Sequence, residues 1–542
     1  MADIQDGRRK DDNGVCTLLN GADLPSCSIV IFGASGDLTA RKLIPALQNL
    51  FAQRCLPPHC YIVGCGRSAM DHEEFRQSLA TFQQETREDD WHTDWPEFAA
   101  RIFYQPLRYD QPEDYQALAT LLTRLDQEQN VAPNRIFYLA VPPSLYPTIG
   151  AQLGGAGLAN AGHDAPAATE ATLFATSGAA TAAGSREHSP SDTPWARIVV
   201  EKPFGHDLPS AVALEKVLHG SFREEQIFRI DHYLAKETVQ NILMLRFANT
   251  IFEPLWNRSY IDYVGIISAE KLGVEHRAGF YESAGVLRDM FQNHMMQLLA
   301  LTAMEPPSRF EATQVQDEKV KIFRALKPLA TSNLAANLVL GQYSPGQIDG
   351  RSVAGYRQEP EVAGDSTTPT FAAMRLWLDN WRWRGVPFYL VSGKRLPVKE
   401  TRIVIQFKEV PHSMFNRELA ADLAANRLAL GIHPQEKISL NFQAKNPGTK
   451  ECLQPVTMDF NYERRTGGRP RLDAYEMVLL DCILGDHMLF WRQDGIELSW
   501  AFLDPILRAC EECHDPAGLL HFYPAGSPGP EAARPWLELL GG

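Results

Sequence analysis

Short apolar runs rich in β-branched residues alternate with amphipathic stretches over roughly the first 230 residues of the chain. This alternation is typical of strands and helices that follow one another in a parallel sheet with helices on its faces. The predicted strands are 28–32, 60–65, 101–106, 135–141, 197–201 and 226–230. Between the fourth and fifth strands, residues 154–194 consist largely of Ala, Gly, Thr and Ser, which favours a surface insertion over a packed element.

The pattern changes after about residue 232. A long helical pattern over 233–249 is followed by strand-like runs that loops with Pro and Gly separate, which indicates a largely antiparallel sheet. These predicted strands are 263–272, 370–378, 387–391, 402–407, 437–442 and 456–462. Two further helical patterns, 281–304 and 474–484, predict helices that cover this sheet.

Two domains are therefore expected, and the length of 542 residues agrees, because a single core seldom grows beyond roughly 250–300 residues. We expect an α/β Rossmann-type nucleotide-binding domain over 28–231 that contains the insertion 154–194. An α+β domain with a large, mainly antiparallel sheet is expected over 232–542, with 1–27 as an N-terminal extension.

Composition and charge narrow the function. Hydrophobic residues make up 44% and charged residues 22% of the chain, as in ordinary folded enzymes. No run approaches the ~18 apolar residues of a membrane helix, and the first residues lack a targeting pattern, so we expect a cytoplasmic protein that does not bind membranes. The net charge of −14 does not suggest nucleic-acid binding. An anionic substrate would need positive charge gathered locally.

The nine cysteines, an odd number, do not indicate a disulfide framework. Cys510-Glu-Glu-Cys513-His514 has the spacing of a c-type haem attachment. Because nothing in the chain indicates export to an oxidising compartment, a chance match is the better interpretation.

A glycine turn follows the first predicted strand and precedes a helical pattern. Glycine permits the close approach of a pyrophosphate to the main chain, and the exposed N–H groups at a helix start attract an anion. Only the spacing G-x-x-G is present, so an ordinary strand–turn–helix remains an alternative. The turn contains Gly33 and Gly36, and the motif runs through Ala34, Ser35, Asp37 and Leu38 to Lys42.

Two basic residues follow later strands of the same predicted sheet. Arg67 stands after the second strand, where many NAD enzymes carry an acidic residue for the ribose, and an Arg there favours NADP. Lys202, in Glu-Lys-Pro-Phe-Gly, stands at the end of the fifth strand, and Pro203 favours an extended backbone at that lysine. A solvated arginine and a structural turn are the respective alternatives.

The segment Arg-Ile-Asp-His-Tyr-Leu-Ala-Lys-Glu begins at Arg229. If a helix starts here, Asp231 is a plausible cap, and the spacing of four residues puts His232 and Lys236 on one face. A histidine and a lysine that converge at a helix start make a good phosphate site, although a solvated helix face is the alternative.

A histidine in the pattern 281–304 is a candidate base. In an ideal α-helix, His294 is rotated by about 140° from Asp289, so that Asp289 is poorly placed to orient it. The partner carboxylate should come from elsewhere, and Asp231 is the natural candidate. Taken alone, His294 is more often a buried, hydrogen-bonded histidine than a catalyst.

At these segments the sequence resembles the glucose-6-phosphate dehydrogenase family. The matching pieces are Gly-Ala-Ser-Gly-Asp-Leu, Glu-Lys-Pro-Phe-Gly, Arg-Ile-Asp-His-Tyr-Leu-x-Lys-Glu and Arg-Asp-x-x-Gln-Asn-His. The likeness continues around Lys394, Tyr475 and Ala525, and it covers roughly residues 28–533. It implies a Rossmann domain, followed by a substrate domain whose large sheet also forms a dimer interface, in a homodimer or homotetramer.

The resemblance also implies the reaction and the roles of the residues. The reaction would oxidise the anomeric hydroxyl of glucose 6-phosphate with transfer of hydride to NADP⁺, at the entry to the pentose phosphate pathway and without a metal. His294 would be the general base and Asp231 its carboxylate partner. The residues that would contact substrate are Lys202, His232, Tyr233, Lys236, Glu270, Asp289, Lys394 and Lys399. The cofactor would be held by residues 33–38, Lys42, Arg67 and Lys202, with 140–143 at its nicotinamide.

The chemistry agrees with these roles, because an imidazole can take the hydroxyl proton near its ordinary pKa of about 6.5 while a carboxylate fixes its tautomer. An enzyme for other hexose phosphates is one alternative. A non-catalytic NADP-binding regulatory paralogue is the other, but it would be expected to have lost the base or the phosphate site, whereas His294, Asp231, His232 and Lys236 are all present.

Overall fold

The computed structural model describes residues 21–86, 93–159, 193–234, 236–414, 423–448, 453–461, 472–511 and 519–541. Most of the predicted extension, residues 160–192 of the predicted insertion, and Cys513 and His514 lie outside these ranges. The chain forms two compact units. The first unit consists of Met1–Lys202, Ala213–Ile230 and Tyr475–Phe490, and the second of Pro203–Val212, Asp231–Ala474 and Trp491–Gly542.

The first unit is built on a seven-stranded sheet. In spatial order its strands are β17 (Phe490–Trp491), β6 (Ile227–Ile230), β5 (Ala196–Val200), β4 (Arg135–Leu139), β1 (Cys27–Phe32), β2 (Cys60–Gly66) and β3 (Ile102–Pro106). The strands from β6 to β3 pair in parallel. The order β3-β2-β1-β4-β5-β6 is that of a dinucleotide-binding Rossmann sheet, in which the strand order reverses between β1 and β4. The predicted Rossmann-type fold is therefore confirmed.

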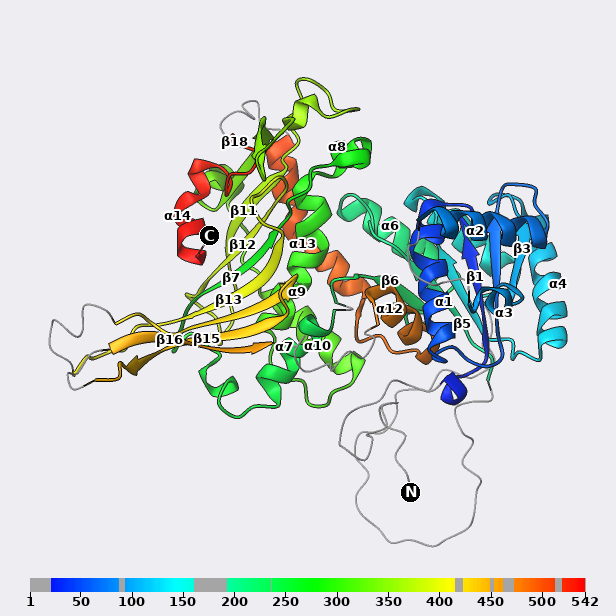
Figure 1. The fold of residues 1–542 in the computed structure, drawn as a ribbon, viewed down its shortest axis with the longest axis horizontal. Helices are drawn as coiled ribbons and strands as arrows, with labels where there is room; N and C mark the ends of the chain where they lie inside the picture. The colour runs from blue at the N-terminus through cyan, green and yellow to red at the C-terminus, as the bar shows by residue number, and fades with distance from the viewer. Residues whose placement is uncertain are drawn as a thin grey trace, which may run out of the picture. The chain divides into compact units, whose positions relative to one another are not determined.

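Helices flank this sheet (Figure 1). They are α1 (Ile44–Ala52), α2 (His72–Thr86), α3 (Trp95–Ala99), α4 (Pro112–Gln129), α5 (Tyr146–Gly155), α6 (Leu208–His219) and α12 (Ala474–Leu484). α12 comes from far along the chain: Glu476 accepts a hydrogen bond of 3.0 Å from Asn49 in α1, and Arg197 in β5 donates to the carbonyls of Cys482 and Ile483. A helix expected to cover the second sheet thus belongs to the first unit.

The second unit contains a nine-stranded sheet. In spatial order its strands are β16 (Leu453–Asn461), β15 (Lys437–Lys445), β14 (Arg427–His433), β13 (Glu400–Phe407), β7 (Ile261–Ala269), β12 (Pro387–Gly393), β11 (Phe371–Trp377), β8 (Leu338–Ser344) and β18 (Leu520–Pro524). Only the pairs β7–β12 and β8–β18 of these strands are parallel, so the predicted, mainly antiparallel sheet is confirmed. A short hairpin, β9 (Gly346–Ile348) and β10 (Arg351–Val353), stands apart from it.

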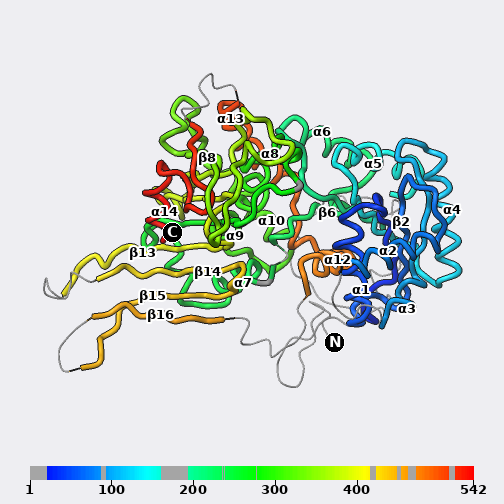
Figure 2. The backbone as a smooth tube through the Cα atoms, turned by 45° about the horizontal axis from the view of Figure 1, so that its top comes forward, coloured from blue at the N-terminus to red at the C-terminus, as the bar shows by residue number. Residues whose placement is uncertain are grey.

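Helices lie on both faces of this sheet. They are α7 (Glu237–Phe247), α8 (Ala278–Val286), a π-helical segment η7 (Leu287–Met295), α9 (Met296–Ala303), α10 (Ala312–Ala325), α13 (Gln493–Glu511) and α14 (Arg534–Leu540). Figure 1 shows α9 and α13 on one face and α14 on the other, and in Figure 2 β15 and β16 run along the outer edge. No helix within the described ranges is long and apolar enough to cross a bilayer.

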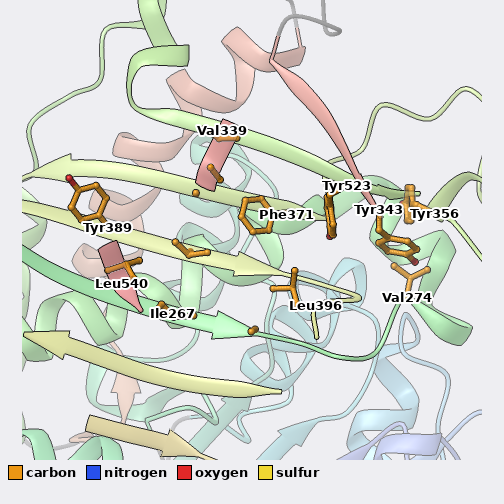
Figure 3. Packing of buried hydrophobic residues seen from close by; sticks show 14 of the residues in the cluster. Ile267, Val274, Val339, Tyr343, Tyr356, Phe371, Tyr389, Leu396, Tyr523 and Leu540 are labelled. Atoms are coloured by element: carbon orange, nitrogen blue, oxygen red, sulfur yellow. The ribbon is translucent and has the colours of Figure 1, made fainter. Parts of the chain in front are cut away.

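The core on the α14 side is rich in aromatic side chains (Figure 3). Alternate residues of the central strands face it, among them Phe371 and Tyr389, and Leu540 of α14 packs there against Gly265. The residues that alternate with these along each strand, such as Leu390 after Tyr389, are buried on the other face of the sheet. Burial on both faces explains why the central strands have continuous hydrophobic runs, as fully covered strands do.

Two predicted helices differ from the structure. The helix expected over 233–249 begins only at Glu237, and residues 231–234 form a turn, so Asp231 is not its cap and His232 does not share a helical face with Lys236. The helix expected over 281–304 is interrupted at Gly285, whose φ of 59° is non-helical, and continues as η7 and α9.

Candidate active site

Several strands of the nine-stranded sheet start or end at one edge. Ala269, the last residue of β7, pairs with Gly393 at the end of β12 and with Glu400 at the start of β13. Glu270 and Lys394, which follow the two parallel strands, therefore leave the sheet side by side, and their side chains form an ion pair. Sheet register thus brings together two residues that lie far apart in the sequence.

The same edge continues into β14. His433, its last residue, pairs with Thr401 in β13, and Lys399 immediately precedes β13. Burial lowers the pKa of His433, and the positive charges of Lys236 and Lys399 lower it further. Burial likewise lowers the pKa of Lys236, with Lys399 as the next cause, while Asp231 and Glu436 act in the opposite direction. Three basic side chains that repel one another form a site that an anion would stabilise.

A buried histidine–carboxylate pair lies close to these basic residues. His294 Nδ1 is 2.6 Å from Asp231 Oδ1, and both side chains are almost fully buried. The backbone N–H of Tyr233 donates to the same carboxylate oxygen at 3.0 Å, and the indole N–H of Trp491 donates to Oδ2 at 3.3 Å. The contact between Asp231 and His294 that helix geometry had suggested is therefore present.

The position of Asp289 relative to His294 differs from the one expected. An offset of about 140° between Asp289 and His294 assumed an ideal α-helix. Both residues lie in η7, where i→i+5 hydrogen bonding brings residues five apart close to one turn. Asp231 is therefore a hydrogen-bond partner of His294, whereas the expected α-helix is a π-helical segment here.

Aromatic rings pack around the buried pair. The Tyr233 ring stacks on His294 with 4.1 Å between centroids, and the His232 ring meets His294 edge-on at 4.9 Å. Lys236 Nζ lies 4.2 Å from the centre of the Tyr233 ring, and the Tyr233 hydroxyl is 3.2 Å from Ser268 Oγ. The turn 231–234 therefore brings His232, Tyr233 and Lys236 together without a shared helical face.

An acidic group lies beside the Glu270–Lys394 pair. Burial raises the pKa of Tyr281, and the nearby carboxylates of Asp289 and Glu270 raise it further. Lys394 Nζ lies 5.1 Å from the centre of the Tyr281 ring. Within the described part of the chain the buried Tyr281 hydroxyl has no hydrogen-bond partner. These four residues form a polar cluster that is suited to hydroxyl groups.

The glycine turn of the first unit lies where the strand order reverses. Gly33 has a φ of 83°, and a Cβ atom there would come within 2.2 Å of the Ala140 carbonyl oxygen after β4. Thr39 donates to the Gly33 carbonyl at 3.1 Å, and the chain then enters a short π-helical segment η2 (Thr39–Leu43) before α1. Glycine is required at residue 33 by both conformation and space.

The remaining predicted cofactor residues lie around this turn. Ala34 is buried, Gly36 and Leu38 are half-buried, and Ser35, Asp37 and Lys42 are exposed. Arg67 is also exposed and directly follows β2, next to Gly66, where a Cβ atom would come within 2.9 Å of the Tyr104 hydroxyl. The edge of the sheet at which a Rossmann domain holds a dinucleotide thus carries a close backbone turn and accessible polar groups.

Lys202 stands at a crossing between the two units. Its neighbour Glu201 accepts from the Tyr138 hydroxyl at 2.7 Å within the first unit. The residues after it belong to the second unit, where the Trp500 indole donates to the Phe204 carbonyl at 3.0 Å. The segments before and after Lys202 are thus each hydrogen-bonded within their own unit.

One set of potential metal ligands occurs among the described residues, formed by Glu215, His219 and Glu224. The buried Arg229 already donates to both carboxylates at 2.8 Å. Its guanidinium would repel a cation, so the set is better explained as a charge network that anchors β6, the strand that leads to Asp231.

Three contributors escaped the sequence-based analysis. His433 ends β14, a strand that was not predicted, and Trp491 precedes α13, which was not predicted either. Tyr281 was noted only as the start of a helical pattern. The pairing register of the strands and the burial of the side chains determine where these residues lie. Neither can be recognised from the neighbouring residues in the sequence.

The chain matches two family models along most of its length. Residues 30–241 match "Glucose-6-phosphate dehydrogenase, NAD binding domain", and residues 243–541 match "Glucose-6-phosphate dehydrogenase, C-terminal domain". Curated relatives named glucose-6-phosphate 1-dehydrogenase include one from Aggregatibacter actinomycetemcomitans, 42% identical over 94% of this chain and 95% of the relative. Another, from Bacillus subtilis, is 41% identical over 94% of this chain and 96% of the relative.

Solved structures agree with these matches. A glucose-6-phosphate dehydrogenase in complex with its substrate glucose 6-phosphate superposes with a TM-score of 0.82 and 34% identity, over 96% of this chain and 98% of the other. Glucose-6-phosphate 1-dehydrogenase from Mycobacterium avium gives 0.75 and 32%, over 95% and 98%.

Proposed function

Because the chain belongs to the glucose-6-phosphate dehydrogenase family, we propose that it oxidises glucose 6-phosphate at the anomeric carbon to the 1,5-lactone and transfers hydride to NADP⁺. The observation that carries this proposal is the buried pair of His294 and Asp231 next to a cluster of basic side chains. The oxidation of an alcohol needs a base such as the histidine of this pair. The binding of a phosphorylated substrate needs positive charge such as that of the basic cluster.

The cofactor residues fit a dinucleotide. Gly33 to Leu38 form the close backbone turn, and the accessible Arg67 is suited to the 2′-phosphate that distinguishes NADP from NAD. Lys42 and Lys202 add positive charge to this proposed site for the anionic cofactor. NADP⁺, when bound, supplies the hydride acceptor.

His294 acts as the general base. With Nδ1–H donating to Asp231, the imidazole lone pair resides on Nε2, which takes the proton of the anomeric hydroxyl as the hydride leaves. The Asp231 carboxylate stabilises the resulting imidazolium. The Tyr233 ring stacked on the imidazole limits its rotation.

His232, Lys236 and Lys399 bind the substrate phosphate. Lys236 and Lys399 repel each other. A phosphate dianion between them relieves this repulsion, which favours substrate binding. His433 belongs to the same cluster of basic side chains, and the two lysines lower its pKa. In a chain with a net charge of −14, such local clustering supports selection of an anionic sugar.

Glu270, Asp289 and Lys394 bind the hydroxyl groups of the sugar, with Tyr233 beside them. Carboxylates accept hydrogen bonds from hydroxyls, and a buried lysine donates to them. The ion pair between Glu270 and Lys394 fixes both side chains before the substrate arrives.

In the decisive experiment, the protein is mixed with glucose 6-phosphate and either NADP⁺ or NAD⁺. The ultraviolet absorbance of the reduced nicotinamide is then followed over time. We expect reduction with a preference for NADP⁺. No reduction with either would favour the non-catalytic regulatory paralogue, and a preference for NAD⁺ would contradict the role of Arg67. Mannose 6-phosphate and galactose 6-phosphate as substrates test whether the enzyme accepts other hexose phosphates.

The surroundings of the enzyme complete the proposal. It works in the cytoplasm as a homodimer or homotetramer, and the region 232–542 serves both substrate binding and self-association. The edge strand β16 supports association, because Met458 and Phe460 are exposed on it. Sedimentation velocity distinguishes a monomer from a dimer and a tetramer.

A further inference from the structure

A lysine is buried close to the histidine–carboxylate pair without a role in the reaction described above. Lys319 in α10 is only 1% exposed, and its Nζ has no hydrogen-bond partner within the described residues. Charged groups are seldom buried unless they are paired, because their desolvation is costly. A lysine retained in such a place needs an explanation.

The face of α10 that carries Lys319 packs towards the pair. Phe323, one turn further along α10, stacks on the Trp491 ring with 5.5 Å between centroids. The Trp491 indole in turn donates to Asp231 Oδ2. α10, Trp491 and Asp231 thus form one continuous packing arrangement.

The charges that face Lys319 come from two places. The Asp231 carboxylate is one, and the start of α13 supplies Arg492 and Asp494. Arg492 donates to Asp317 at 2.7 Å and to Asp494 at 2.8 Å, and Arg492 and Asp494 act on Lys319 in opposite directions. Of the charges that face Lys319, the Asp231 carboxylate has the largest effect, and it is also the hydrogen-bond acceptor of His294.

We propose that Lys319 is a positioning residue for the oxidation, whose ammonium group offsets the Asp231 carboxylate and so limits how strongly His294 holds a proton. The proposal rests on the role of His294 as the base. A carboxylate alone would stabilise the imidazolium and so raise the pKa of His294. The base would then stay protonated over more of the acidic pH range. A second positive charge next to the carboxylate weakens that effect.

The protonation of Lys319 falls in the range where this matters. Burial lowers its pKa to about 7 from the ordinary 10.5; Asp231 and Asp494 raise it, and Arg492 lowers it. Below about 7 the ammonium is charged, so it opposes protonation of His294 on the acid side of the pH profile. Between about 7 and 10.5 the unfolded chain binds this proton while the folded protein does not, so this group makes stability rise with pH over that window. Below about pH 7 Lys319 is charged in the folded protein, and the buried charge then lowers the stability by its full amount.

The test replaces Lys319 by methionine, which has similar volume and no charge. For Lys319→Met we expect the acid limb of kcat/KM against pH to move upwards by about one pH unit. We also expect a higher Tm at pH 6, because an unpaired buried charge has been removed. Lys321→Met in the same helix is the control, since the Lys321 side chain is 62% exposed and pairs with Glu318. It should leave the acid limb unchanged.

An unmoved acid limb in Lys319→Met, or a shift to lower pH, would overturn the proposal, whatever happens to kcat. A lower Tm together with an unmoved limb would identify a purely structural lysine. His294→Asn separates the two levels: if it retains activity, the base itself is misassigned, whereas if it is inactive and the Lys319→Met limb is unmoved, only the role of Lys319 fails.

Discussion

The Asp231 carboxylate receives hydrogen bonds from three parts of the chain: the side chain of His294, the backbone of Tyr233 and the indole of Trp491. A carboxylate held in this way cannot rotate to release the imidazole, so the ring keeps one tautomer and one orientation. Little reorganisation then remains for the moment at which the proton is transferred. At the residue scale the proposed chemistry depends on this fixed acceptor as much as on the proposed base, His294.

We expect His294→Asn to lower kcat by about 10²–10⁴-fold while KM for glucose 6-phosphate changes little, because other residues form the proposed phosphate site. His232→Asn provides the contrast, since it removes a proposed phosphate contact and should mainly raise KM. Steady-state kinetics of both variants measure the difference. A near-normal kcat in the first variant, or an unchanged KM in the second, would show that the role concerned is misassigned.

At the scale of elements, strands buried on both faces were the easiest to predict. β1 and β2 have continuous runs of Ile and Val that only a covered parallel sheet explains. β14 escaped prediction because Arg427-Leu-Ala-Leu-Gly-Ile-His contains small residues and a glycine that weaken its strand signal. Its position, and with it the place of His433, depends on pairing with β13.

The helix that carries His294 shows a second limit of sequence-based prediction. Apolar periodicity over 281–304 indicated one helix, but it did not reveal the interruption at Gly285 or the π-helical hydrogen bonding of η7. These features depend on contacts with neighbouring segments, such as the hydrogen bond from the Val286 N–H to the Pro369 carbonyl. The motif indicated which residues matter, whereas tertiary packing determines where they point.

The turn between β1 and η2 provides a prediction at this scale. Gly33→Ala should weaken NADP⁺ binding by about tenfold or more, because a residue with a Cβ atom is strained at this φ and would collide with the Ala140 carbonyl. Gly155→Ala in the same unit is the matched control, since nothing lies within 4 Å of the added atom. Fluorescence titration with NADPH measures both. Equal affinities in the two variants would contradict the role of the turn.

At the scale of the whole molecule, neither compact unit is one continuous piece of chain. The polypeptide passes from one unit to the other after Lys202, Val212, Ile230, Ala474 and Phe490. Lys202, proposed to contact substrate and cofactor, directly precedes the first crossing, and Asp231, the proposed partner of the base, directly follows the third. Both residues therefore lie next to a point where the backbone passes from one unit to the other.

The late segment of the first unit can be tested by mutation. Ile483→Ala in α12, a fully buried site, should lower the free energy of unfolding by about 2–5 kcal/mol and speed hydrogen exchange in β5, because Arg197 in that strand holds the Ile483 carbonyl. Leu484→Ala, at a neighbouring side chain that is 42% exposed, should change stability by no more than about 0.5 kcal/mol. Mass spectrometry of exchanged amides locates the effect. Faster exchange confined to the second unit would contradict the assignment of α12.

The same segment has a consequence for synthesis on the ribosome. The strands up to β6 are translated long before α12 and β17, which complete their sheet. Until residue 490 has left the exit tunnel, β6 is an open sheet edge, and α12, with its buried residues Val478, Leu479 and Ile483, is not yet packed into the unit. The nascent nucleotide-binding unit must therefore wait for the second unit to be made, and during that interval we expect it to depend on chaperones that shield exposed strands.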